Sequence, residues 1–84
     1  MNIYLIGQRE NKDPDAYYSA VVVAATEEEA RDIHPDGSGK IDWEKMEKKM
    51  FVYWARRRED VHVTQIGVSD SEEARVVVAS FNAG

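Results

Sequence analysis

The stretch YYSAVVVAA, residues 17–25, constrains the fold of this chain more than any other feature. Nearly every position in it is apolar, and its middle is β-branched, which favours a strand over a helix. A strand without a polar side is typical of the centre of a sheet, where both faces are covered. The sequence therefore predicts a sheet with this stretch as a central strand.

Three other stretches predict further strands. Residues 2–8 are rich in β-branched and aromatic types, residues 61–68 alternate between apolar and polar types, and residues 75–81 are again apolar on both sides. The loop at 9–16 holds Pro14 together with Asp and Asn residues, which are turn formers. We therefore expect four strands in two sequential pairs.

The apolar period changes after the second strand, which predicts a short helix. Thr26 is a suitable N-cap, and Glu29 three residues later completes a capping box. Pro35 disfavours helical geometry at His34, so this helix should end after about two turns.

A second helix is predicted from Asp42, a suitable N-cap, to the arginine run at 56–58. Its apolar residues have the spacing i, i+3, i+7, i+10 and i+11, which is typical of an amphipathic helix. These residues are Trp43, Met46, Met50, Tyr53 and Trp54. Arginines in its last turn would favour the negative end of the helix dipole.

The predicted element order is β-β-α-α-β-β, in one domain that spans residues 1–84. We expect an α+β fold, with a four-stranded antiparallel sheet and one or two helices inserted between two hairpins. Helices this small would leave part of an apolar sheet uncovered. A homodimer is therefore open as a way to cover the remainder, because exposed apolar faces tend to bind partners.

Composition limits the classes of function. The chain carries 11 basic and 16 acidic residues, a net charge of −5, which argues against a general nucleic-acid binder. It has no cysteine, so disulfides and thiolate metal sites are excluded. No apolar run approaches the roughly 20 residues of a membrane span, and the first residues lack the basic region of a signal peptide. We therefore expect a cytoplasmic protein with no membrane partner.

The segment HPDGSGKIDWEK has the interior letters of a calcium loop. With Gly39 at position 6 of a 12-residue EF-hand loop, Asp36 and Asp42 fall on ligand positions. The first and last positions need carboxylates, but they hold His34 and Lys45. The sequence therefore predicts a Gly-rich connector between two helices, with no metal site and no cofactor.

The arginine run Arg56, Arg57 and Arg58 is a candidate binding site, because guanidinium groups bind phosphates and carboxylates through paired hydrogen bonds. Trp54 beside it could stack on a base. The alternative interpretation is a solvated helix end, with Trp54 in the core as part of the apolar stripe.

Tyr17 and Tyr18 adjoin the first loop, and strand alternation predicts that one of them faces the core and the other faces solvent. The exposed tyrosine is a candidate contact residue, as is the acidic edge that contains Glu27 and Glu28. The sequence contains no nucleophile motif and no metal-ligand spacing. We therefore predict no catalytic residue and expect a protein that is not an enzyme.

Two stretches together resemble a family of small uncharacterised bacteriophage proteins. They are YYSAVVVAATEEEARDIHPDG at 17–37 and VHVTQIGVSDSEEARVVVASFNAG at 61–84. Members of this family tend to share a SAVV segment followed by EEEAR and IHP, a middle with Trp, a strand with IG and a terminal ASFNAG. Because these motifs are related to fold rather than to catalysis, the resemblance implies a phage origin more than an activity.

The phage resemblance leads to two hypotheses, both by analogy. The first is a non-enzymatic accessory protein that binds and inhibits a host protein, for example in counter-defence against an anti-phage system. The alternative is an oligomeric ligand-binding module that sequesters a nucleotide signal.

Overall fold

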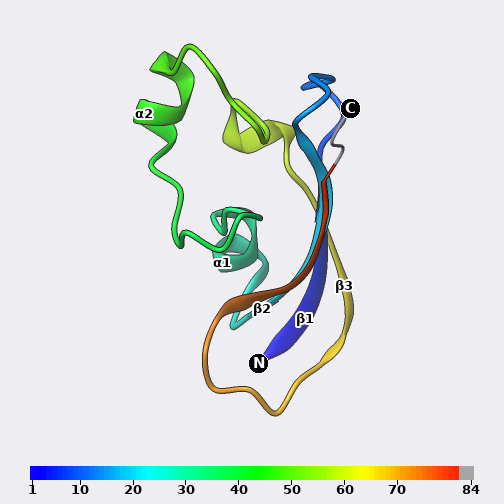
Figure 1. Cartoon of the computed structure of the whole chain (residues 1–84). Coiled ribbons are helices and arrows are strands. Elements are labelled where there is room, and N and C mark those ends of the chain that lie inside the picture. The colour runs from blue at the N-terminus through cyan, green and yellow to red at the C-terminus, as the bar shows by residue number, and fades with distance from the viewer. Residues whose placement is uncertain (82–84) are drawn as a thin grey trace.

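A computed structural model describes residues 1–81 and confirms the predicted α+β fold with a four-stranded antiparallel sheet. The strand order is β3-β1-β2-β4, and the helices follow β2 in the chain (Figure 1). The strands are β1 (Asn2–Gly7), β2 (Tyr17–Ala24), β3 (His62–Val68) and β4 (Arg75–Phe81). The helices are α1 (Glu27–Arg31), α2 (Trp43–Lys48) and the 3-10 helix η1 (Arg58–Asp60). Residues 82–84, which close the ASFNAG stretch, lie outside the described residues.

The apolar strand β2 lies at the centre of the sheet, as predicted. It forms a hairpin with β1, in a register that runs from Asn2 opposite Ala24 to Gly7 opposite Ser19. Strand β3 pairs with β1 and strand β4 pairs with β2, both antiparallel. Although β3 and β4 are sequential, they lie at opposite edges of the sheet, so these two strands do not pair with each other as we expected. Their connection, residues 69–74, therefore crosses one end of the sheet.

One face of the sheet, which we call the inner face, carries the hydrophobic core. Tyr4, Ile6, Ala20 and Val22 alternate with outward-facing neighbours and are buried. Helix α1 packs on this face across β1, β2 and β3, and Figure 1 shows the helices on one side of the sheet. The core is thus a two-layer arrangement, with the sheet as one layer and the segment between β2 and β3 as the other.

Both predicted N-caps are confirmed. Thr26 Oγ1 accepts a hydrogen bond from the Glu29 N–H at 3.1 Å, and Glu29 Oε1 accepts from the Ala25 N–H at 2.8 Å. Asp42 Oδ1 accepts from the Lys45 N–H at 3.3 Å and so begins α2. These side chains satisfy backbone donors that have no partner inside a helix.

The prediction of one helix from residue 43 to the arginine run is wrong, because α2 ends at Lys48. Lys49 has an extended backbone, with ψ of 142°. Beyond it, Phe51 and Tyr53 are exposed while Val52 and Trp54 are buried, which is the period-two alternation of an extended chain. The spacing of the apolar residues is compatible with a helix and, after residue 50, also with an extended chain. Tertiary contacts select the extended chain.

Hydrogen bonds from another part of the chain hold the extended segment in place. Asn11 Nδ2 donates to the carbonyl oxygens of Val52 at 2.6 Å and Trp54 at 2.9 Å. The Tyr17 N–H donates to the Tyr53 carbonyl at 2.8 Å. Gln8, which is buried, fixes this loop in turn, because its side chain accepts from the Asn11 N–H at 2.8 Å. A helix through these residues would have used the same carbonyls internally.

The substitution Asn11→Asp tests this explanation for the short helix. It replaces an amide that donates to two carbonyls by a carboxylate, whose oxygens would face those carbonyl oxygens. We expect the free energy of unfolding, measured by urea denaturation, to fall by about 2–4 kcal/mol. In the control Asn2→Asp the loss should stay below about 1 kcal/mol, since the Tyr4 hydroxyl can donate to the new carboxylate. Equal losses in the two variants would contradict the assignment.

Candidate functional site

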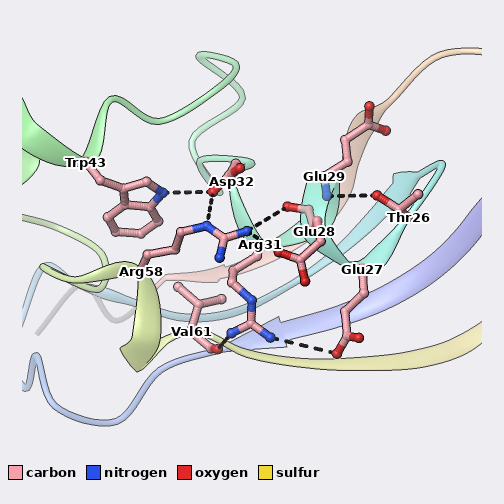
Figure 2. Close-up of polar contacts among 9 residues, drawn as sticks. All are labelled: Thr26, Glu27, Glu28, Glu29, Arg31, Asp32, Trp43, Arg58 and Val61. Atoms are coloured by element: carbon pink, nitrogen blue, oxygen red, sulfur yellow. Dashed lines mark hydrogen bonds and ion pairs between the residues drawn. The ribbon is translucent and has the colours of Figure 1, made fainter.

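A polar junction centred on Asp32 connects the three helical pieces (Figure 2). Asp32 Oδ1 accepts from Trp43 Nε1 at 2.9 Å and from Arg58 Nε at 2.8 Å. Arg58 Nη2 also donates to Glu28 Oε2 at 2.6 Å. Hydrogen bonds to Glu28 and Asp32 raise the pKa of Arg58 above its ordinary value. We call this group of four residues the Asp32 junction.

The acidic edge predicted as a contact surface is mostly paired within the chain. Glu28 belongs to the Asp32 junction, and Glu27 lies 3.8 Å from Arg31. Arg31 in turn donates to the Val61 carbonyl. Glu29 caps the start of α1. These carboxylates therefore serve the position of α1, although the side chains of Glu27 and Glu28 keep substantial exposure.

The three predicted arginines do not converge on one site. Arg58 lies in the Asp32 junction, whereas Arg56 Nη1 donates to the Lys49 carbonyl at 2.8 Å. Arg57 is exposed just before η1. Arg56 thus lies beside the end of α2, and Arg58 points back to α1.

Trp54 is fully buried in the core, so it cannot stack on a ligand. Its Nε1 is the one buried side-chain nitrogen or oxygen in residues 1–81 without a hydrogen-bond partner. Burying roughly 200 Å² of indole stabilises the fold by about 5 kcal/mol. That exceeds the roughly 1–3 kcal/mol for an unsatisfied donor, so the core position is favourable overall.

The two adjacent tyrosines divide as strand alternation predicts. Tyr17 packs against the core and meets the ring of His34 edge-on, with ring centroids 6.4 Å apart. Tyr18 is exposed on the other side of β2. Whether Tyr18 contacts a partner stays a prediction.

The calcium-like segment forms a tight loop whose carboxylate is used inside the loop. Gly37 and Gly39 have φ of 83° and 113°, a region that favours glycine. Asp36 Oδ1 accepts from the Ser38 N–H at 2.8 Å and lies 3.0 Å from His34 Nδ1. In the described part of the chain, no three His, Asp or Glu side chains gather as metal ligands would.

His34 and Asp36, which lie together in this loop, both have lowered pKa values. Burial lowers the pKa of His34; the nearby carboxylate of Asp36 opposes this, and the charge of Lys49 adds to it. Partial burial by itself would raise the pKa of Asp36. Hydrogen bonds from Ser38 and the charges of His34 and Lys49 outweigh this effect and hold its pKa below the ordinary value. In the neutral imidazole, Nδ1 accepts from the Asp36 N–H at 3.1 Å.

The structure reveals a surface that the sequence interpretation missed. After α2, Met50 is 85% exposed and Phe51 is 70% exposed, and Tyr53 is 48% exposed two residues later. The exposed cations close to them in sequence are Lys45, Lys48, Lys49, Arg56 and Arg57. We call these eight residues the basic apolar surface. The signal in the sequence was the run Lys48-Lys49-Met50-Phe51, which the helical interpretation had distributed around a helix.

Charge is strongly segregated toward this surface. Residues 45–58 contain six cations and the single carboxylate Glu47, a net charge of +5. Because the whole chain has a net charge of −5, the remaining residues carry −10. The basic apolar surface therefore presents a local positive potential on an otherwise acidic protein, which favours an anionic partner.

Comparison with protein-family models, curated proteins and solved structures found no match. Among the described residues, none of the helices has the length and apolar character needed to cross a membrane.

The setting of His34 predicts a pH dependence of stability. Because the folded-state pKa of His34 is lowered, the unfolded chain takes up the proton first as the pH falls through about 6.5. The stability contributed by neutral His34 is therefore complete above this pH and is lost as the pH falls toward 5. Thermal unfolding at pH 7 and pH 5.5 should show a smaller drop in Tm for His34→Gln than for the wild type.

The matched control is His62→Gln, since His62 is an exposed strand residue and the other histidine of the chain. The smaller drop in Tm should be specific to His34→Gln. If His34→Gln loses as much stability on acidification as the wild type does, the explanation from burial is wrong.

Proposed function

We propose that this chain is a non-enzymatic phage accessory protein that binds and inhibits a host protein in the host cytoplasm. The observation that carries the proposal is the basic apolar surface, where Met50 and Phe51 are exposed side by side. The phage context comes from the two sequence stretches that resemble a phage family. Inhibition would follow from occupying a surface of the host protein, without chemistry on the part of this chain.

A protein partner fits the composition of the surface. Methionine, aromatic residues and arginine are enriched at the centres of protein interfaces. Fully burying the side chains of Met50 and Phe51 would contribute about 1.5–3 kcal/mol each. Exposure to water of 85% and 70% means that nearly all of this free energy remains to be gained on binding.

The charge of the surface defines the chemistry of the partner. Lys45, Lys48 and Lys49 lie at i, i+3 and i+4, so their side chains gather on one side of α2. Arg56 is held at the end of α2 by its hydrogen bond to the Lys49 carbonyl. A complementary host surface has an apolar pocket for Phe51 with carboxylates around it.

The nucleotide alternative loses two of its expected contacts. Trp54 is buried, and Arg58 is engaged by Glu28 and Asp32. Arg56, Arg57 and the exposed Tyr53 remain available on the basic apolar surface, so this function is kept as an outcome of the test. A homodimer stays a separate proposal, because a different surface would form it.

Affinity capture from host cells tests the proposed function. The baits are the wild type, the double variant Met50→Ser/Phe51→Ser and the control Val68→Ser, which removes a side chain that is 74% exposed on β3. We expect one host protein to be retained by the wild type and by the control, and to be lost from the double variant. With the purified host protein, the double variant should weaken Kd by about 100-fold.

A charge-reversed variant, Lys48→Glu/Lys49→Glu, separates the two parts of the surface. It should slow association and remove most of the salt dependence of binding. Retention of the host protein by the double serine variant would contradict the proposal. So would a thermal shift with a nucleotide and no captured host protein, a result that would favour the nucleotide alternative.

A further inference from the structure

The second face of the sheet, which we call the outer face, has no helix on it. Figure 1 shows α1 and α2 on the opposite side. Leu5, at the centre of this face, is 41% exposed, and Val78 on β4 is 61% exposed. Leu5 lies between the buried Tyr4 and Ile6, which places its side chain on the outer face. Val78 is on the same face because it pairs with Val21, which in turn pairs with Leu5.

The strand register arranges the outer face in three rows, each running from β3 through β1 and β2 to β4. The first row is Gly67, Ile3, Val23 and Arg75; the second is Thr64, Leu5, Val21 and Val78; the third is His62, Gly7, Ser19 and Ser80. In the first two rows, the residues on β1 and β2 are apolar. The third row consists of glycine and serine residues together with His62.

The outer face avoids acidic residues although the chain is acidic. The chain has 16 carboxylate side chains, and none of them occupies any of the positions in the three rows. Within the rows the basic residues are Arg75 and His62, at diagonally opposite corners, and Arg9 lines the hollow beside Gly7. A face without carboxylates can meet a copy of itself with little like-charge repulsion.

We propose that a second copy of this chain covers the outer face, so that two sheets pack face to face in a homodimer. The proposal is independent of the host partner, because the basic apolar surface lies on the other side of the molecule. On β2 the chain itself buries Val23 of the outer face and half-buries Val21, so the second copy would mainly cover the exposed Leu5 and Val78 in the middle row.

The shape of the outer face favours a particular two-fold axis. Gly7 has no side chain, and a hollow of about 460 Å³ lies there, lined in part by Leu5, Ser19 and Thr64. A two-fold axis perpendicular to the strands exchanges the first and third rows. It therefore places Ile3 of the second copy over the hollow at Gly7.

The same axis keeps the charged corners apart. It places Arg75 opposite Ser80 of the second copy, and His62 opposite Gly67. Each basic side chain then meets a small neutral residue and keeps access to water at the edge of the interface.

The area of the face sets the expected strength of association. Four strands about 4.8 Å apart, each about seven residues of 3.3 Å, give a footprint of roughly 440 Å² per copy. Standard interfaces bury about 800 Å² of accessible surface per partner, so this face is smaller than a standard interface and falls in the size class of weak association. We therefore expect a dimer that dissociates in the micromolar range.

Sedimentation equilibrium of the purified chain tests the proposal. The wild type should be dimeric at high micromolar concentration and should dissociate on dilution. Leu5→Glu and Val78→Glu should each shift the dissociation constant by at least about 100-fold toward monomer, because each buries a carboxylate in the apolar interface. Val78 lies on an edge strand and is well exposed, so this variant is expected to fold even if Leu5→Glu does not.

The control Phe51→Ser changes the basic apolar surface and should leave the dimer intact, which separates this test from that of the host partner. A wild type that remains monomeric at several hundred micromolar would overturn the proposal. Folded Leu5→Glu and Val78→Glu variants that still dimerise like the wild type would overturn it as well.

Discussion

The contact on which the arrangement of the helical layer depends is the Asp32 carboxylate, which accepts hydrogen bonds from Trp43 and Arg58 through one oxygen. These donors come from α2 and η1, which are short and separated by a segment without regular structure. Helices of this length are not stable alone, so their positions depend on such tertiary contacts. The sheet forms by pairing of its own strands, but the segment from 43 to 60 is attached by the junction, by Asn11 and by buried side chains.

This attachment has a functional consequence, because the basic apolar surface belongs to the attached segment. Val52 and Trp54 enter the core while Phe51 and Tyr53, which alternate with them, face solvent. Because the segment is extended, burying Val52 and Trp54 turns Phe51 and Tyr53 toward solvent. A continuous helix would not produce this alternation. The protein combines two surfaces of different character: a basic apolar one on the helical layer and, on the outer face of the sheet, a partly apolar one without carboxylates in its rows.

Sequence patterns predicted the elements whose formation depends on residues close to them in the chain. The apolar run of β2 and the caps at Thr26 and Asp42 were identified from residue types alone, because strand burial and capping follow from near neighbours. The length of α2 was not predictable in this way. Its end depends on Asn11, more than 40 residues before Trp54, donating to carbonyls that a helix would have used. Arg58 likewise has a structural role because of Glu28 and Asp32, which are about 30 residues before it in the chain. The exposed Met50 and Phe51 were missed because the end of α2 was.

Hydrogen exchange of single amides in Asp32→Asn, measured by NMR, tests the central claim that this carboxylate positions the segment from 43 to 60. The Met46 N–H bonds within α2 and the Tyr17 N–H bonds to Tyr53, so both report on the attached segment. We predict that their exchange accelerates about ten-fold or more while amides paired between β1 and β2 keep their wild-type rates. The control is Glu27→Gln, in which all rates should stay unchanged. Unchanged exchange at Met46 and Tyr17 in Asp32→Asn, or an equal acceleration across the whole sheet, would contradict the account.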